Sequence, residues 1–380
     1  MSKKMKIVMI GLVSIVCLAL SFGAGCALES QTTSDSVQAL DIVREAWDLI
    51  FTNYVDKDKL EESTLAAGAI KGMVEALDDP HCSYLTADSF QLSQSHWEGK
   101  FEGIGAYVGE QEGNIVIIAP IAGSPAEKAG IQAGDTILEI DGKSVSGMSL
   151  MEAVLKIRGP GGTPVLLLVL HQGATEPEEI EIIRAEIEIP SVTLEMREDI
   201  AYVKITNFTE RTGNELAVVL REINQEKASG IVLDLRSNPG GLLNTVVDVS
   251  GYFLDKGIVY YMVDKEGEKT ATPVKRKSLQ TGLPLVVLVD SYSASGSELL
   301  AGALQDNSRA IIAGTKTYGK GSVNVPYRLK DGSGLYLATA RWLTPSGNLI
   351  EGEGIQPDYT LELEGEDAIQ WAIEYLKENK

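Results

Sequence analysis

The chain has 380 residues, of which 44% are hydrophobic, 23% charged and 6% aromatic, as is typical of a globular protein with two or three domains. These fractions exclude a disordered chain and a protein that crosses a membrane many times. The formal net charge is −21, and no dense stripe of lysine and arginine reverses it locally, so we expect no nucleic acid partner.

The N-terminus has the pattern of an export signal. Three lysines among the first six residues precede an apolar run over 7–20, and small residues follow before Cys26. The residues before Cys26 resemble a bacterial lipobox, in which this cysteine becomes the lipidated first residue, although Gly23 stands where that motif usually has leucine. A lipoprotein, a cleaved signal peptide and an uncleaved membrane anchor stay open. Each places the body outside the cytoplasm, in the cell envelope or periplasm.

We take residues 1–26 as this leader and the polar stretch 27–39 as a linker. Apolar residues then recur at helical spacing between Leu40 and Leu77, and Asp78-Asp79-Pro80 ends the second predicted helix. The helical region, 40–97, contains no cluster of candidate nucleophiles. We therefore expect it to serve packing or assembly.

The next region, 98–186, changes to the two-residue period of strands. It predicts strands and short helices in the order 106–108, 115–118, helix 125–129, 136–140, helix 151–157 and 165–170. The stretch SPAEKAGIQAGDTILEIDG closely resembles the central motif of PDZ domains. That resemblance implies a module that binds the end of another chain, with backbone N–H groups of one loop facing the terminal carboxylate. Gly103, Ile104, Gly105 and Ala106 match this loop, although a Gly-x-Gly sequence alone also fits an ordinary tight turn.

The region 187–365 alternates strands with helices, which predicts an α/β core with crossover connections. The strands are expected at 200–205, 231–235, 258–263, 283–289 and 310–313, and the helices at 242–253 and 296–304. Antiparallel strands are expected after Lys316, and a last amphipathic helix is expected at 366–380.

Three loops of this core follow strands, where α/β proteins place their sites. The glycines of DLRSNPGG open a helix and fit an oxyanion cradle or a plain turn equally well. The serines of DSYSASGSE place a hydroxyl at a helix N-terminus, or they are only caps. The lysine of TYGKG is flanked by glycines, and taken alone such a lysine is usually a solvated surface charge.

Histidine and cysteine are too scarce to supply these loops. The three histidines are His81, His96 and His171, and Cys82 is the single cysteine after the leader. The body therefore has no internal disulfide and no CxxC metal clip, and we expect neither a metal nor another cofactor. A hydrolytic site in the second half that does not borrow from the first must work without histidine or thiolate.

The three loops, in this order and followed by TPSGNLIEGEGIQPD, closely resemble the carboxyl-terminal processing peptidases over nearly all of the chain after the leader. The resemblance implies a multidomain α+β and α/β protein with an N-terminal helical segment, a PDZ domain and a crotonase-like (ClpP-like) protease core. It implies Ser295 as nucleophile and Lys320 as general base. Lysine acts as a base only when neutral, so desolvation must lower its ordinary pKa of about 10.4.

The same resemblance implies roles for further residues. Gly296 and either Gly240 or Gly241 would hold the oxyanion of the acyl-enzyme reaction, and Asn324 occupies the place of a glutamine that orients the lysine amine. Asparagine has the same polar groups but is shorter by one methylene, and we expect it still to orient Lys320. Supporting positions are Arg236, Glu298, Asp306 and Thr317, and Arg158 matches an arginine that links a bound PDZ domain to the site in some members.

Two rival functions remain from the sequence. One is a non-catalytic PDZ adaptor on a degenerate protease core, and the other, weaker one is an acyl-CoA enzyme on a crotonase-like core. The expected partners are proteins or peptides with free C-termini and, through the leader or a lipid, the membrane. The sequence leaves a homodimer open.

Overall fold

The computed structural model describes residues 39–97, 100–111, 113–363 and 365–379. The chain divides into two compact units, Met1–Gly72 and Met73–Lys380, which we describe separately. The leader and the linker, including Cys26, lie outside the described residues, apart from residue 39. No helix among the described residues is both long and apolar enough to cross a membrane.

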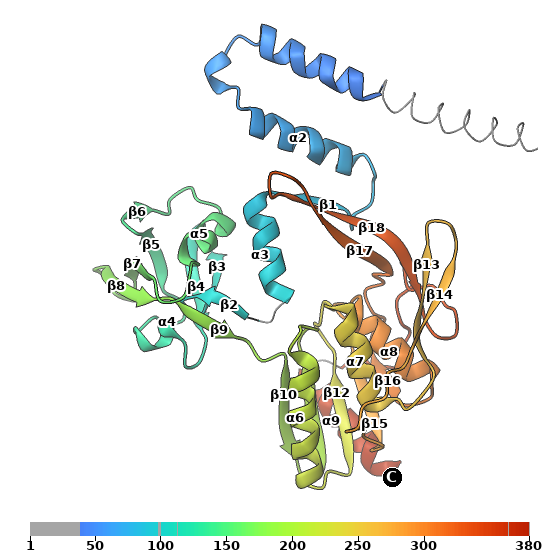
Figure 1. Ribbon diagram of the computed structural model, residues 1–380. Coiled ribbons are helices and arrows are strands. Elements are labelled where there is room, and N and C mark those ends of the chain that lie inside the picture. Colours follow the sequence, from blue (N-terminus) through green and yellow to red (C-terminus); the bar gives the residue numbers. More distant parts are fainter. Residues whose placement is uncertain (1–38, 98–99, 112, 364, 380) are drawn as a thin grey trace, which may run out of the picture. The chain divides into compact units, whose positions relative to one another are not determined.

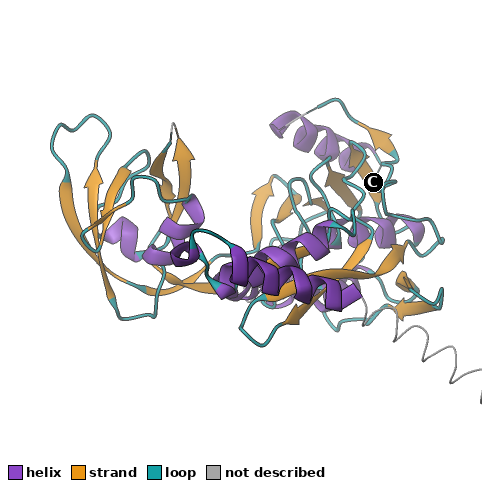
Figure 2. Ribbon diagram, turned by 90° about the horizontal axis from the view of Figure 1, so that it is seen from above, coloured by secondary structure: helices purple, strands orange, loops and turns teal. Residues whose placement is uncertain are grey.

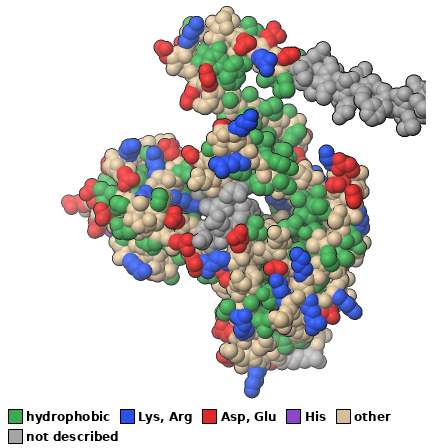
Figure 3. All heavy atoms as spheres, in the orientation of Figure 1, with side chains coloured by type: hydrophobic (Ala, Val, Ile, Leu, Met, Phe, Trp, Pro, Cys, Tyr) green, Lys and Arg blue, Asp and Glu red, His purple; other side chains and the backbone are tan. Residues whose placement is uncertain are grey.

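The N-terminal unit is helical, as predicted. A helix spans residues 39–53, a short 3-10 helix spans Lys57–Lys59 (η1), and α2 (Glu62–Glu75) begins in this unit. Large hydrophobic side chains of the first helix are exposed, including Leu40 at 61% and Ile42 at 67% (Figure 3). An apolar surface of this kind is typical of helices that pack against another element or chain.

The segment predicted as a PDZ domain forms a small sheet with two short helices (Figure 2). The sheet has the order β3-β4-β5-β7-β8, with β6 beside β5, and the helices are α4 and α5. Its core is aliphatic, and strands β2 and β9 form a separate antiparallel pair at the two ends of the segment. The bounds are β2 Lys100–Gly103, β3 Ala106–Gln111, β4 Asn114–Pro120, α4 Pro125–Lys128, β5 Thr136–Ile140, β6 Lys143–Ser144, α5 Leu150–Ile157, β7 Pro164–Leu170, β8 Glu178–Ile183 and β9 Ala185–Glu188.

The second half contains a six-stranded sheet of order β10-β11-β12-β15-β16-β19, parallel except for the β10–β11 pair (Figure 1). Its strands are β10 Val192–Arg197, β11 Ile200–Ile205, β12 Gly230–Asp234, β15 Leu285–Val289, β16 Ile311–Gly314 and β19 Tyr359–Thr360. The helices are α6 Thr212–Gln225, α7 Leu243–Phe253, α8 Gly296–Asp306 and α9 Gly365–Glu378. The predicted alternation of strands and crossover helices is confirmed.

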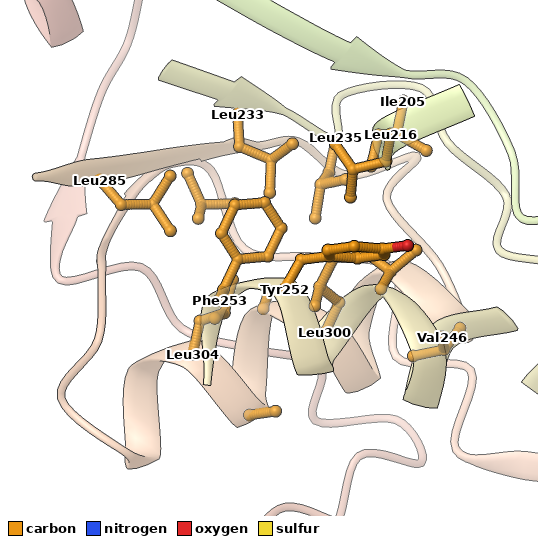
Figure 4. Close-up of a cluster of buried hydrophobic side chains, with 14 of the residues drawn as sticks. Ile205, Leu216, Leu233, Leu235, Val246, Tyr252, Phe253, Leu285, Leu300 and Leu304 are labelled. Atoms are coloured by element: carbon orange, nitrogen blue, oxygen red, sulfur yellow. The ribbon is translucent and has the colours of Figure 1, made fainter. Parts of the chain in front are cut away.

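Helices cover both faces of this sheet, and residue alternation along the strands explains how. In β12, Ile231 and Leu233 pack on the side of α6, α7 and α8, and Val232 packs with α9 on the opposite side. Figure 4 shows the first of these clusters, in which Tyr252 and Phe253 of α7 and Leu300 of α8 lie under the strands. This packing holds the N-terminal ends of α7 and α8 in fixed positions beside the sheet.

A second, five-stranded sheet was only partly predicted. Strands β17 (Ser322–Arg328) and β18 (Gly334–Leu343) form the expected antiparallel pair after residue 316. The strand expected at 258–263 does form, as β13 (Ile258–Asp264), but it pairs with β18 and with β14 (Lys269–Pro273) rather than joining the parallel sheet. The spacing of apolar residues predicts a strand but does not choose its partners, which explains this error.

The helical region at 40–97 also differs from the expectation. After α2, the chain forms a strand, β1 (Ser83–Leu85), and then a further helix, α3 (Ala87–Trp97). Strand β1 pairs with β18, with Ser83 opposite Tyr336. Residues that precede the PDZ segment thus complete a sheet of the second half of the chain.

A buried carboxylate in the PDZ segment predicts a pH-dependent stability. The Asp135 side chain is fully buried, and its Oδ1 lies 2.8 Å from Nδ1 of His171, whose Nε2 lies 3.4 Å from Glu178. The hydrogen bond to Asp135 raises the pKa of His171. A raised histidine pKa stabilises the fold below the ordinary value of about 6.5, and this stabilisation is lost as pH rises through the raised value.

We expect the backbone amides of β5 and β7 to lose protection from hydrogen exchange by a few-fold between about pH 6 and pH 8.5, after correction for intrinsic exchange rates. His171→Gln should remove this dependence, because glutamine does not titrate in this range. Amides of α6 in the same samples provide the internal control. An equal pH dependence in wild type and variant would contradict the role of the histidine.

Candidate active site

Three loops meet at one edge of the parallel sheet. The loops follow β12, β15 and β16, which are neighbours in the sheet, and their carboxyl ends therefore lie side by side. They contain the residues of the predicted site at 235–242, 290–295 and 315–321. The sequence motifs that lie far apart in the chain are thus brought together by the order of the strands.

Ser295 caps the N-terminus of α8 on a strained turn. Its backbone has φ 52° and ψ −110°, in the region of positive φ that residues other than glycine rarely adopt. Gly240 packs directly on this turn, because a Cβ added to it would lie 2.7 Å from the Gly296 nitrogen and 2.9 Å from the Ser295 Cβ. The close approach explains why a glycine stands at position 240.

A buried carboxylate joins the serine turn to the lysine loop. Glu298 is fully buried, and its Oε2 accepts hydrogen bonds from the backbone nitrogens of Ser295 at 2.7 Å and Lys320 at 2.9 Å. Its Oε1 accepts from the Thr317 hydroxyl and from the Gly319 nitrogen, both at 2.6 Å. Glu298 therefore fixes the positions of the two loops relative to each other.

Burial and hydrogen bonding have opposite effects on this carboxyl group. Desolvation by burial raises the pKa of Glu298, and the hydrogen bonds from Thr317, Gly319, Ser295 and Lys320 lower it, with a net upward shift. All four neighbours donate, so the ionised carboxylate, which only accepts, is the form that satisfies them together.

Lys320 lies on the wall of a cavity of about 600 Å³ at the same edge. Its side chain is half-buried, and the cavity is also lined by Ser237, Pro239, Tyr292, Ala294, Tyr318 and His81. Ala294 is the residue before Ser295, so the cavity opens beside the serine turn. Two exposed tyrosines, Tyr292 at 71% and Tyr318 at 59%, border it.

His81 is the residue of this cavity that the sequence analysis missed. It precedes β1, and the pairing of β1 with β18 brings it to the cavity wall. Its Nε2 lies 3.2 Å from Oε1 of Glu351, and its backbone nitrogen donates to Asp79 at 2.9 Å. The aspartates and proline before it indicated only the end of a helix, and nothing local to the sequence reveals a pairing with residues some 250 positions later.

Asn324 lies in β17, four residues after the lysine, and its amide hydrogen bonds lead away from Lys320. Its Nδ2 donates to the backbone oxygen of His81, and its Oδ1 accepts from the Ser322 hydroxyl at 3.0 Å. Among the described residues, these are the amide's hydrogen-bond partners. Asn324 thus fastens the segment before β1 onto the strand that follows the lysine.

Among the described residues, the hydrogen-bond partners of two predicted supporting residues lie outside the serine turn. Arg236 donates to Asp234 through Nε at 2.9 Å and Nη2 at 2.7 Å, and to the backbone oxygen of Gly365. Asp306 is the last residue of α8, about 16 Å along the helix from Ser295, and it accepts a hydrogen bond from the Ser346 nitrogen. Thr317, in contrast, contacts Glu298 directly, and its hydroxyl accepts from the Ile355 nitrogen at 2.7 Å.

The predicted peptide-binding loop of the PDZ segment joins β2 to β3. The backbone oxygens of Ile104 and Gly105 accept hydrogen bonds from Ala126 and Ile121, whereas their own N–H groups have no hydrogen-bond partner among the described residues. Gly105 has φ 78°, and a Cβ there would lie 2.4 Å from the Ser124 Cβ.

Arg158 lies over the aromatic ring of Phe101, with 4.4 Å between its Cζ and the ring centroid. Burial lowers the pKa of its guanidinium.

The described residues contain no group of three or more histidine, cysteine, aspartate or glutamate side chains that could hold a metal ion. The cavity wall offers the Lys320 amine, the His81 imidazole and the Ser237 hydroxyl, and Ser295, at the N-terminus of α8, directly follows Ala294 of the wall. This set suits attack of a serine on a carbonyl group.

Comparisons with known proteins agree with this arrangement. The model of peptidase family S41 matches residues 199–361, that of the PDZ domain matches 92–170, and that of the activating protease CtpB N-terminal domain matches 23–89. The chain is similar to the carboxy-terminal-processing protease of Bartonella bacilliformis, with 41% identity over 80% of this chain and 70% of the relative. It is also similar to the carboxy-terminal processing protease CtpA of Bacillus subtilis, with 37% identity over 96% and 78%.

Among solved structures, the chain resembles the photosystem II D1 C-terminal processing protease. The identity is 30% and the TM-score 0.51, over 83% of this chain and 91% of that one. Fold and site together define a serine-type peptidase with a PDZ domain. The chain belongs to the carboxy-terminal processing proteases of peptidase family S41.

Proposed function

We propose that the protein cleaves peptide bonds with Ser295 as nucleophile and Lys320 as general base, and that it selects substrates by their free C-termini. The observation that carries the catalytic part is the single buried carboxylate of Glu298, which binds the backbone of both residues at once. A shared anchor of this kind holds a nucleophile and its base at a constant separation, as acyl transfer requires.

The reaction follows from the groups in the cavity. The neutral Lys320 amine takes the proton of the Ser295 hydroxyl, whose oxygen attacks the peptide carbonyl carbon. Backbone N–H groups of Gly296 and one of the glycines 240 and 241 hold the oxyanion. The lysine ammonium then protonates the leaving amine as the C–N bond breaks, and a water molecule, deprotonated by the lysine, hydrolyses the acyl-enzyme.

The unpartnered N–H groups of Ile104 and Gly105 support the selection of C-termini. Both belong to the loop before β3, in which the backbone oxygens already have partners. Two adjacent free donors suit the two oxygens of a terminal carboxylate, and the edge of an adjoining strand can pair with the peptide. Arg158, packed on Phe101 beside this loop, adds a positive charge near the expected ligand.

Cleavage of a peptide that carries a natural protein C-terminus tests the proposal. The wild type should cleave the free acid, and Ser295→Ala should lower kcat by at least about 10³-fold, because it removes the nucleophile. Amidation of the peptide's C-terminus should raise KM about tenfold or more, because the neutral amide replaces one carboxylate oxygen with a donor.

The two parts of the proposal fail separately in this assay. Cleavage by Ser295→Ala at the wild-type rate would exclude the serine mechanism. Equal KM for acid and amide would exclude selection of C-termini. Binding of the free acid without any cleavage by the wild type would favour the PDZ adaptor on an inactive core.

We also propose that the body lies outside the cytoplasm, held by its leader or by a lipid on Cys26. This part rests on the sequence pattern of residues 1–26 alone. A second copy of the chain is our proposed partner for the exposed apolar side chains of the helix at 39–53.

A further inference from the structure

A buried asparagine lies between the two halves of the proposed oxyanion site. Asn238 is fully buried in the loop after β12, and its Nδ2 donates to the Ile205 backbone oxygen, at the end of β11, at 2.9 Å. Its Oδ1 accepts from the Gly240 nitrogen at 2.9 Å. The side chain therefore fixes the glycine loop to the edge of the sheet.

The backbone oxygen of the same residue binds the nucleophile loop. It accepts from the Ala294 nitrogen at 3.0 Å and from the Ser297 hydroxyl at 2.9 Å. Ala294 and Ser297 lie on either side of the Ser295–Gly296 pair. One residue thus connects the glycine loop, the sheet and the turn that carries the nucleophile.

These bonds also distinguish the two candidate glycines. The Gly240 N–H already donates a hydrogen bond to Oδ1 of Asn238. Gly241 forms a parallel bridge with Phe208, in which Phe208 bonds to the oxygen of Gly240 and to the nitrogen of Leu242. In such a bridge the N–H of the middle residue points away from the paired segment, which leaves the Gly241 N–H available for another acceptor.

We propose that Gly241 and Gly296 donate the two hydrogen bonds to the oxyanion and that Asn238 is the positioning residue that sets their separation. This inference rests on the proposed peptidase function. Asn238 does not touch the substrate in this scheme. It acts because the donors must point to where the oxyanion forms, and a misplacement of about 1 Å costs on the order of 100-fold in rate.

Two variants of the full-length chain test this role. Asn238→Ala removes both side-chain bonds and should lower kcat for a tail peptide about 100-fold, with KM within about twofold. Ser297→Ala removes only the hydroxyl that binds the Asn238 backbone oxygen and should lower kcat about tenfold. Because neither change touches Lys320, the pH profile of kcat should keep the midpoint of the wild type.

A peptide aldehyde separates oxyanion positioning from a general loss of structure. Its tetrahedral adduct with the serine uses the oxyanion donors, so its affinity should fall in parallel with kcat in both variants. Affinity for an uncleaved peptide, measured in the Ser295→Ala background, should not change. Ser250→Ala is the matched control, because that buried hydroxyl donates to the Val246 oxygen within α7, away from the loops.

The kinetic results for these variants support or overturn the positioning role of Asn238. Wild-type kcat and aldehyde affinity in Ser297→Ala and Asn238→Ala would overturn the inference while leaving the peptidase function intact. An equal loss of kcat in Ser250→Ala would also overturn it, since the effect would then be one of stability. If Asn238→Ala does not fold, Ser297→Ala alone carries the test, and an inactive wild type would refute the peptidase function and this inference together.

Discussion

Lys320→Ala should lower kcat for a tail peptide by about 10³-fold and change KM by no more than about twofold. We expect a large loss because, in the proposed mechanism, the lysine amine both accepts the serine proton and gives it to the leaving amine. Initial rates measured over a range of peptide concentrations give kcat and KM for the wild type and the variant.

Lys316→Ala is the matched control, because this lysine is exposed and lies four residues earlier in the same loop. It should retain the wild-type kcat and KM. His81 provides the decisive contrast, since it is the other nitrogen base among the described residues of the cavity wall. If Lys320→Ala kept the wild-type rate and His81→Ala lost it, the general base would be the histidine.

The second large effect is expected for Glu298→Ala, which should lower kcat about 100-fold or more and also lower the unfolding temperature. The variant leaves the donors of Ser295, Thr317, Gly319 and Lys320 without their acceptor, at about 1–3 kcal/mol for each one left unsatisfied. The serine turn and the lysine loop would then no longer share a hydrogen-bond acceptor. Steady-state kinetics and thermal unfolding measure the two consequences.

Glu215 offers a control with the same chemistry in another place. Its Oε2 accepts from the nitrogen and hydroxyl of Ser191 and from the Val192 nitrogen, and its Oε1 accepts from Arg211. It links α6 to β10 and not to the catalytic loops. Glu215→Ala should therefore destabilise the fold and leave kcat close to wild type, and a loss of kcat equal to that of Glu298→Ala would contradict the specific role of Glu298.

Acid pH should change the stability and the activity of the protein in opposite directions through Glu298. Because the pKa of Glu298 is raised, its contribution to stability is present below the ordinary carboxyl value of about 4.3 and is lost as pH rises through the raised value. Activity has the opposite dependence, because a protonated Glu298 must give up one of its four donors. We expect kcat to fall as pH is lowered through the raised pKa of Glu298, while the contribution of this group to stability increases over the same range.

Much of this architecture could be predicted from residue patterns. The alternation of apolar strands and helices identified the parallel core, because strands buried on both faces are almost continuously apolar. The three loops were singled out because each follows a predicted strand, but the roles of Ser295 and Lys320 came from the resemblance to the carboxyl-terminal processing peptidases. The convergence of the loops needs only neighbouring parallel strands, which is the common outcome of crossover connections.

The parts that could not be predicted depend on contacts between residues distant in the chain. The spacing of apolar residues in β13 does not reveal that it pairs with β18. The hydrogen-bond partners of Asn324 and Asn238 depend on which way each side chain points in the fold. The position of an asparagine in the sequence does not reveal that direction. His81 was missed because its place in the cavity follows from a strand of three residues.

The pairing of β1 with β18 has a consequence for the order in which the cavity wall is completed. Ser83 is synthesised well before Tyr336, its partner in the sheet. At a synthesis rate of about 5–20 residues per second, the time between the two residues is roughly 10 to 50 seconds. Until residue 336 has been synthesised, β1 has no partner strand, and the cavity lacks the part of its wall formed by His81. His81 therefore reaches the cavity wall only after nearly all of the core has been synthesised, so the first and last thirds of the chain must meet before this part of the wall forms.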